Sequence, residues 1–389
     1  MLTACEKRAC ISAISLSLAL AAGSLSAQNK LPKPRRLGSG VVLRRDSATG
    51  ELRRATPPAT DTAAGPAIIR TRVALVEVGC NVFATDSAPV RGLTAADFRL
   101  YEDGLEQRIV HFDASTTPAS IVLALDTSPS VFRDLDEIRE AARTLSRSLV
   151  PQDEVAVVTF AARTRLVLPF SRDRALLERA IAAYGLPKDP EEARGSKIYE
   201  SVYLAAEDMF GGVPRTGRKA IVLLTDGQDT SLGLSWDPAS AQSKPGASAD
   251  RLAFEDVARA LASRGVELYA ITTQPHPSAL TDTWLAAHRS EVLVSAKARE
   301  AGIPHYTLYL AELVRRAGGR LFFLRETGTL GDVYRRIAES LGAQYVLGYY
   351  PSPGLARPGW RSLRVELASE GNAGARVTHR VAYYVPASP

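Results

Sequence analysis

Cysteine is scarce in this chain of 389 residues, which contains only three. Two of them, Cys5 and Cys10, lie near the amino terminus, so removal of that stretch would leave Cys80 alone. A single thiol excludes an internal disulfide framework, and the fold must be stabilised by core packing. Cys80 lies in an alternating strand pattern, and we expect it to be a small buried hydrophobe rather than a reactive thiol.

The apolar run near the amino terminus, residues 11–25, is shorter than the roughly 20 residues that a membrane span requires. Lys7 and Arg8 precede this run, and small residues follow it before Gln28. A basic, then apolar, then small-residue order is typical of a secretory signal peptide. We therefore expect residues 1–27 to be removed and the mature chain to be extracytoplasmic, either periplasmic or secreted; an uncleaved anchor is the alternative.

The body of the chain lacks excess charge, although the whole sequence carries +6. Residues 28–64 hold eight Lys and Arg against three acids, a charge of +5, and the leader adds +1, so the rest sums to zero. A body without basic excess argues against nucleic-acid binding. The basic, proline-containing stretch 28–65 is typical of a disordered linker. The more specific alternative is that this stretch is weakly attracted to an anionic membrane or envelope polymer.

Signatures of several enzyme classes are also missing. The chain has no phosphate-binding loop, no His-Glu-x-x-His and no Gly-x-Ser-x-Gly, and its five His residues lack metal-ligand spacing. Asp-Thr-Ser occurs at 126–128 and 229–231, as in aspartic proteases, but that fold is all β and the first motif leads into a helical pattern. An aspartyl nucleophile for phosphoryl transfer usually has a second acid two residues later, where this chain has Ser128.

The stretch from Ile121 to Ser130 organises the chain. Five apolar residues lead into Asp126, and Ser128 and Ser130 follow at alternate positions. A buried strand that ends in this way directs oxygen ligands into a loop, and a helical pattern begins directly afterwards. In open α/β sheets the ligand crevice lies at the carboxyl ends of such strands. We therefore place the candidate site there.

Two motifs, in the right order, carry a family resemblance. Asp126-Thr127-Ser128-Pro129-Ser130 has the Asp-x-Ser-x-Ser form of the metal-ion-dependent adhesion site of von Willebrand factor type A domains. Leu223-Leu224-Thr225-Asp226-Gly227 resembles the second signature of that fold. The resemblance covers roughly 121–342, and the flanking segments are similar to those of a bacterial secreted family that carries this domain between β-rich segments.

The resemblance implies a site for a divalent cation, Mg²⁺ or alternatively Mn²⁺ or Ca²⁺. In the resembled site two serines, here Ser128 and Ser130, bind the metal directly, while two acids, here Asp126 and Asp226, hold waters and orient the ligands. The fifth ligand is usually a threonine on a separate loop, and Ser196 stands in the matching place. From the residues alone, Ser196 could instead be a helix N-cap, and the first motif an Asx turn with capping serines.

Residues 117–342 alternate helical and strand patterns, and 155–160 are nearly all apolar, as a central strand covered on both faces requires. This alternation predicts an α/β fold with a doubly wound, mostly parallel, Rossmann-like sheet. The stretches 186–195, 227–249 and 274–304 interrupt it. The first two follow elements whose ends should face the crevice, so we expect these loops to frame the site.

The segments on either side of the α/β part, 66–116 and 343–389, have strand patterns instead. Within the first, strands are expected at 98–102 and 107–112, joined through Asp103-Gly104, a dipeptide that favours hairpin turns. We expect the two segments to pack together as one β-rich module that the α/β domain interrupts.

The sequence and the resemblance together predict an exported, non-enzymatic binding protein. Its metal site would capture a protein partner through an Asp or Glu of that partner, because a carboxylate suits a hard cation. The alternative is a structural module of the envelope in which the metal only stabilises the fold.

Overall fold

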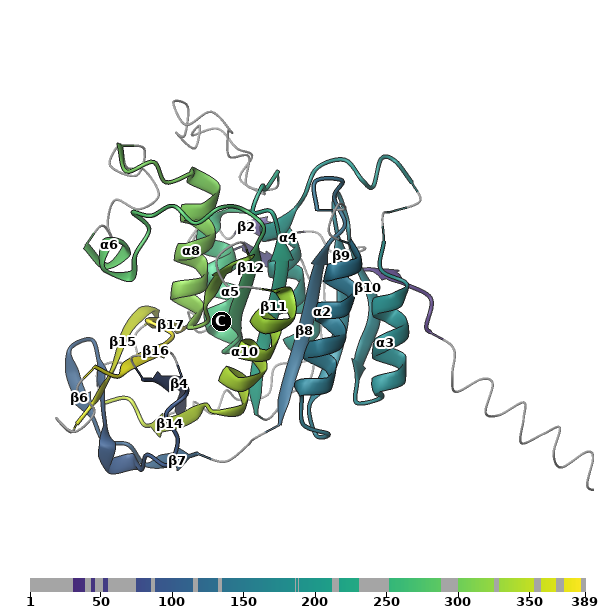
Figure 1. The fold of residues 1–389 in the computed structure, drawn as a ribbon. Helices are drawn as coiled ribbons and strands as arrows, with labels where there is room; N and C mark the ends of the chain where they lie inside the picture. Colours follow the sequence, from purple (N-terminus) through teal and green to yellow (C-terminus); the bar gives the residue numbers. More distant parts are fainter. Residues whose placement is uncertain are drawn as a thin grey trace, which may run out of the picture.

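The central feature of the fold is a seven-stranded sheet with the order β1-β10-β9-β8-β11-β12-β13 (Figure 1). The computed structural model describes residues 31–38, 43–45, 52–54, 75–84, 88–114, 118–131, 135–185, 187, 189–211, 217–230, 252–287, 300–324, 329–352, 358–368 and 374–385. The expected leader, 1–27, lies outside the described residues. The strands are β1 (Arg35–Arg36), β8 (Ala119–Asp126), β9 (Glu154–Phe160), β10 (Thr164–Ser171), β11 (Arg218–Thr225), β12 (Glu267–Thr272) and β13 (Leu321–Phe323).

Strands β9, β8, β11, β12 and β13 run parallel, whereas β10 and β1 add antiparallel strands at one edge. The parallel order confirms the predicted α/β class. Every residue of β8 is buried, with Val122 and Ala124 in the core of one face and Ile121, Leu123 and Leu125 in that of the other. Because both faces of such a central strand contact apolar cores, its sequence is a continuous apolar run.

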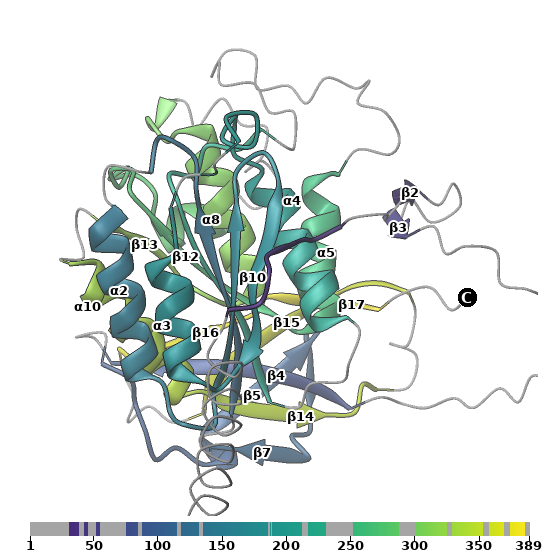
Figure 2. The same ribbon diagram turned by 90° about the vertical axis from the view of Figure 1, so that its right-hand side faces the viewer.

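Helices cover both faces of the sheet, as the two views show (Figures 1 and 2). None of the helices in the described ranges is both long and apolar enough to span a membrane. One face carries α2 (Leu135–Ser148), α3 (Arg174–Ala182) and α10 (Leu330–Gly342), and the other carries α4 (Ile198–Leu204) with a π-helical turn (Ala205–Met209), α5 (Phe254–Arg264) and α8 (His305–Ala317). The short helix α6 (Asp282–Ala287) lies within the long stretch 274–304.

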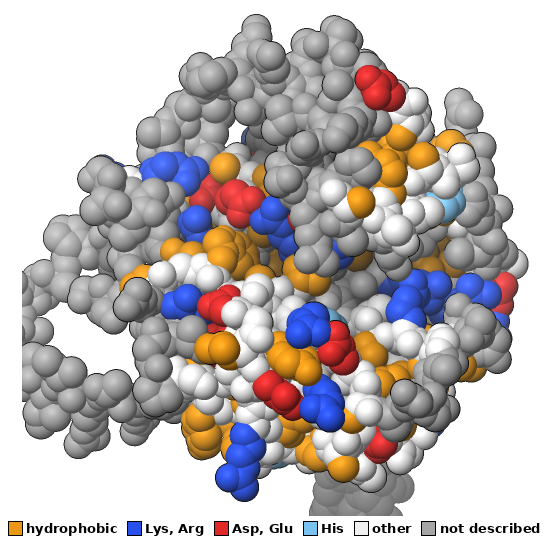
Figure 3. All heavy atoms as spheres, turned by 90° about the vertical axis from the view of Figure 1, so that its left-hand side faces the viewer, with side chains coloured by type: hydrophobic (Ala, Val, Ile, Leu, Met, Phe, Trp, Pro, Cys, Tyr) orange, Lys and Arg blue, Asp and Glu red, His pale blue; other side chains and the backbone are white. Residues whose placement is uncertain are grey.

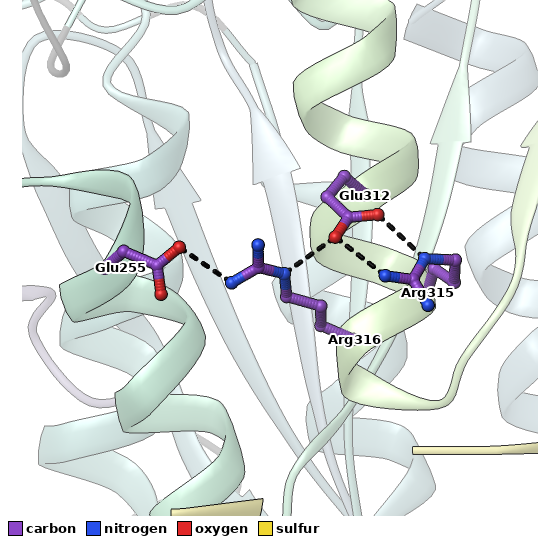
Figure 4. A network of polar contacts seen from close by, with 4 residues as sticks. All are labelled: Glu255, Glu312, Arg315 and Arg316. Atoms are coloured by element: carbon purple, nitrogen blue, oxygen red, sulfur yellow. Dashed lines mark hydrogen bonds and ion pairs between the residues drawn. The ribbon is translucent and has the colours of Figure 1, made fainter. Parts of the chain in front are cut away.

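A partly buried charge network joins α5 to α8 (Figure 4). The Glu312 carboxylate, 1% exposed, accepts hydrogen bonds from Arg315 Nε at 2.7 Å and from Arg316 Nε at 2.7 Å. Arg316 also donates to Glu255 at 2.8 Å, and its guanidinium lies over the Phe254 ring. Burial alone would raise the pKa of Glu312, but the two arginines outweigh it and hold that pKa below its usual range.

The flanking segments form two four-stranded antiparallel sheets, with the orders β16-β4-β14-β7 and β17-β15-β5-β6. Both sheets combine strands from before and after the α/β part, which confirms the predicted β-rich module of the two flanking segments. Their shared core includes Cys80, which is fully buried, and burial raises the pKa of its thiol. The strands are β4 (Val76–Phe83), β5 (Phe98–Glu102), β6 (Leu105–Gln107), β7 (His111–Asp113), β14 (Tyr345–Tyr349), β15 (Gly359–Leu367), β16 (Arg376–His379) and β17 (Ala382–Val385).

The Asp103-Gly104 hairpin forms as predicted, with positive φ angles of 47° and 83°. The single strand expected at 107–112 is wrong, however, because the chain splits there. β6 ends at Gln107 and pairs with β5, whereas β7 begins at His111 and pairs with β14 in the other sheet. The segment 107–112 therefore crosses from one layer of the module to the other.

The segment 28–65, expected to be a disordered linker, is ordered in its described part. Strand β1 pairs with β10, and Leu37, which is 2% exposed, enters the core beside α4. A second pair of short strands, β2 (Leu43–Arg45) and β3 (Leu52–Arg54), is tied to α5 by an ion pair of 2.8 Å between Arg45 and Asp256. Two buried leucines, Leu37 and Leu52, among basic residues and prolines give no periodic pattern, so the sequence could not indicate this docking.

Candidate metal centre

Asp126 lies at the centre of the candidate site, at the last residue of β8. Its side chain is fully buried, and Oδ1 accepts a hydrogen bond from the backbone N–H of Ser128 at 2.9 Å. Oδ2 accepts two more, from Ser196 Oγ at 2.9 Å and from Thr225 Oγ1 at 2.8 Å. A single carboxylate thus joins three segments that are far apart in the sequence.

The two serines that follow Asp126 converge on each other. Ser128 Oγ and Ser130 Oγ are 3.0 Å apart; Ser128 is 5% exposed, and Ser130 is exposed. The loop is held from beneath, because Thr127 donates to Phe160 O through both its N–H and its hydroxyl. The hydroxyl pair therefore lies at the boundary between the buried carboxylate and solvent.

Ser196 reaches the site from the loop before α4. The N-cap of that helix is Lys197, so the alternative of Ser196 as the cap is wrong. Instead, Ser196 O accepts hydrogen bonds from Thr230, at 2.7 Å from its N–H and 3.0 Å from its hydroxyl. Gly195 has a φ of 75°, and a Cβ there would lie 2.9 Å from Thr230 Oγ1, so this close approach requires glycine.

The end of β11 brings the second acid to the same edge of the sheet. β11 lies beside β8 in register, and Asp226, 4% exposed, follows its last residue, Thr225. Asp226 Oδ1 accepts the N–H of Gln228 at 2.9 Å, and Gly227 turns the chain with a φ of 84°. The structure therefore brings all five predicted residues to one edge, with Asp126 in the middle.

Burial raises the pKa of Asp126 to about 6, hydrogen bonds from Ser128 and Thr225 oppose that rise, and the charge of Asp226 adds to it. Two carboxylates in one buried cluster repel each other, so a cation placed between them would lower the free energy of the charged pair.

Sequence reasoning missed three residues that build the site. Thr225 was treated only as part of a motif, yet its hydroxyl bonds Asp126 directly. Tyr184, from the end of α3, donates its hydroxyl to the Asp126 carbonyl. Asp229, considered only as a protease-like acid, is 2% exposed and accepts the N–H of Tyr199 at 3.2 Å in the first turn of α4. Asp229 could have been predicted from its position three residues after Asp226 at the end of β11. The sequence around Tyr184 contains no motif that indicates the site.

The donor set fits a hard divalent cation. Adjacent ligands of an octahedral Mg²⁺ lie about 2.9 Å apart, since each metal–oxygen bond is about 2.05 Å. The separation of 3.0 Å between Ser128 Oγ and Ser130 Oγ matches this spacing. Hydroxyl and carboxylate oxygens are also the ligand types that such a cation prefers. The described residues contain no metal-binding group built from three or more His, Cys, Asp or Glu side chains. The present cluster is of a different kind, because it combines two acids with hydroxyls.

A comparison with protein-family models identifies the domain that holds the site. Residues 120–286 match the model of the von Willebrand factor type A domain. The chain contains a von Willebrand factor type A domain. In the structure this domain runs from β8 to α6 within the matched residues and includes every residue of the candidate centre. The parallel α/β sheet excludes the aspartic-protease fold, because aspartic proteases are all-β proteins.

No curated protein matches the chain. Among solved structures, an aerotolerance-related membrane protein of Bacteroides fragilis is 17% identical, covers 57% of this chain and 98% of its own, and has a TM-score of 0.39. A von Willebrand factor type A protein of Catenulispora acidiphila is 13% identical over 82% of this chain and 74% of its own, with a TM-score of 0.38. Proximal thread matrix protein 1 of the mussel byssus, with a zinc-occupied adhesion motif, is 16% identical over 61% and 48%, with a TM-score of 0.37.

Von Willebrand factor type A domains are generally interaction modules rather than enzymes, and they commonly bind a divalent metal at the adhesion motif. The domain here is placed between the two segments of the β-rich module, and α10 leads directly into β14.

Proposed function

We propose that this chain is an exported, non-enzymatic binding protein whose metal centre captures a protein partner through an Asp or Glu of that partner. The observation that carries the proposal is the arrangement of the five oxygen-bearing side chains, buried at Asp126 and exposed at Ser130. A site that is closed on the protein side and open to solvent suits an external ligand better than a purely structural cation.

In the proposed centre Ser128, Ser130 and Ser196 bind Mg²⁺ directly, or Mn²⁺ or Ca²⁺ in its place. Asp126 and Asp226 hold waters and orient the ligands. The hydrogen bond from the Ser196 hydroxyl to Asp126 supports this role, and the one from the Ser128 backbone N–H holds the serine loop beside the carboxylate. The cation would keep much of its positive charge, because its three direct protein ligands are neutral hydroxyls. Its solvent side, beside the exposed Ser130, would leave a coordination position open. A carboxylate of the partner is the ligand that fits such a position.

Capture can be tested by pull-down from the native envelope with the mature chain as bait. With Mg²⁺ present we expect a partner to be retained, and chelation or Ser130→Ala should release it while circular dichroism stays native. Ser148→Ala is the matched control, because Ser148 is an exposed serine at the far end of α2. Retention that survives chelation and Ser130→Ala would favour the purely structural role of the metal.

Export is proposed from the order of basic, apolar and small residues in the leader. We expect amino-terminal sequencing of the protein from its native host to begin near Gln28. A soluble cytoplasmic chain that begins at Met1 would contradict this proposal. The exposed Lys33, Arg35 and Arg36 further support weak association of the amino-terminal segment with an anionic envelope surface.

A further inference from the structure

Ser196 is the one proposed metal ligand that lies neither on the loop after β8 nor directly after β11. It is 4% exposed, and its hydroxyl donates to Asp126 Oδ2 at 2.9 Å. α4 begins two residues later, at Ile198, and its N-cap, Lys197, makes no side-chain hydrogen bond to the helix. The first N–H groups of a helix have no partner within that helix. The loop that carries Ser196 is therefore held by groups from elsewhere in the chain.

The segment that follows Asp226 supplies three of these contacts. Asp229 Oδ1 accepts the N–H of Tyr199 at 3.2 Å, inside the first turn of α4. Thr230 donates its N–H to Ser196 O at 2.7 Å and its hydroxyl to the same oxygen at 3.0 Å. One segment thus carries the second acid of the centre and also fixes the loop that carries the third hydroxyl.

Asp229 differs from its two neighbours in being buried. It is 2% exposed, whereas Gln228 and Thr230 are exposed. A buried carboxylate is tolerated where hydrogen bonds or charges stabilise it. Negative charge is also favourable beside the first turn of a helix, where the N–H groups carry partial positive charge. Asp229 is therefore placed to hold the start of α4, and with it the residue two positions before that helix.

We propose that Asp229 is a positioning residue of the metal centre, which holds Ser196 where its hydroxyl can bind the cation beside Asp126. The inference rests on the proposed function, because it takes Ser196 as a metal ligand. A ligand that is held in place beforehand loses less freedom when its partner binds. Groups that orient metal ligands typically raise metal affinity by about tenfold to a hundredfold. Because Asp229 acts through the backbone of α4, we expect the lower end of this range.

Binding of Mn²⁺ alone to the full mature chain measures this effect, since electron paramagnetic resonance counts the free ion directly. Asp229→Ala should raise the dissociation constant about tenfold. Asp229→Asn should stay within about threefold of the parent, because its amide oxygen can still accept the Tyr199 N–H. Thr230→Val changes an exposed residue and keeps one of its two hydrogen bonds, so its loss should also be about threefold.

Asp153→Ala is the matched control. Asp153 is also a buried aspartate, 4% exposed, and it accepts the backbone N–H of Ala119 at the opposite end of β8 from the metal centre. The control should lower the melting midpoint and leave the Mn²⁺ dissociation constant unchanged. On the face shown in Figure 3, the described acidic side chains are interspersed with basic and apolar ones, so this face offers Mn²⁺ no acidic cluster that would obscure the titration.

Asp126→Ala distinguishes a failure of the metal centre from a failure of the positioning role. Binding equal to that of the parent in Asp126→Ala would contradict the metal centre, and the role of Asp229 with it. Loss of binding in Asp126→Ala together with parent-like binding in Asp229→Ala would overturn the positioning role alone. Equal losses in Asp229→Ala and Asp229→Asn would overturn it by assigning the effect to charge. An equal loss in Asp153→Ala would do so by assigning the effect to general destabilisation.

Discussion

Replacing Leu37 by alanine should lower the free energy of unfolding by about 3 kcal/mol, as is usual for a leucine truncated in a packed core. Leu37 is 2% exposed, and its backbone N–H donates to Thr164 O at 3.0 Å, directly after β1 pairs with β10. The loss should appear as a lower melting midpoint by thermal unfolding followed with circular dichroism.

Leu105→Ala is the matched control for this change, since the same side chain is 57% exposed there. Its effect should stay within about 0.5 kcal/mol, as for most surface substitutions. If Leu37→Ala were equally mild, the amino-terminal segment would not be docked on the domain, and its order in the structure would have no energetic consequence.

Glu267→Gln should remove a large pH dependence of stability. Glu267 begins β12 and lies in a cavity of 260 Å³ between the domain and the β-rich module. Burial raises its pKa to about 7, although hydrogen bonds from Tyr269 and Gln344 and the charges of Arg218 and Arg380 oppose that rise. The folded state therefore holds this proton more tightly than the unfolded state does.

The sign follows from the raised pKa. The stabilising contribution of the protonated carboxyl is fully present below the ordinary glutamate value of 4.5 and is lost as pH rises through about 7. A shift of this size corresponds to about 3 kcal/mol. Urea unfolding between pH 4 and pH 8 should show the parent losing stability relative to Glu267→Gln over this window.

Glu106→Gln provides the comparison, because the Glu106 side chain is 53% exposed and pairs with Arg99 at the surface. Its difference from the parent in free energy of unfolding should be small, as for most surface substitutions. A constant offset between the parent and Glu267→Gln across the same window would show that Glu267 does not titrate at the junction.

The sequence predicted those parts of the fold whose signal is local. The continuous apolar run of β8 and the acid and serines after it indicated a buried strand that ends at a site. The end of α8 also has a local cause in Gly318-Gly319, where Gly318 has a φ of 85° and a Cβ on Gly319 would collide with Leu268 O. Each of these patterns lies within about a dozen residues, so no knowledge of distant partners was needed.

Features that depend on distant partners could not be predicted. Tyr184 reaches Asp126 because α3 and the end of β8 share one core on the same face of the sheet. Ser196 was separated from a helix-capping role only by the point at which α4 begins, which makes Lys197 the N-cap. The docking of Leu37 and the positions of β13 and β16 at the ends of their sheets depend on the order of the described strands. The order of strands is a property of the assembled fold, and the sequence of one strand does not determine its neighbours.

Thermal unfolding of the mature chain with and without Mg²⁺ tests the metal centre most directly. At a hundredfold excess over the dissociation constant, a cation that binds only the folded state should add about 2.7 kcal/mol of stability. Asp126→Ala should abolish this gain, Ser130→Ala should reduce it, and Ser148→Ala should keep it in full. Ser130 is exposed, so its variant tests the ligand role without removing a core contact. An equal response to Mg²⁺ in the parent, Asp126→Ala and Ser130→Ala would contradict a metal centre at the end of β8.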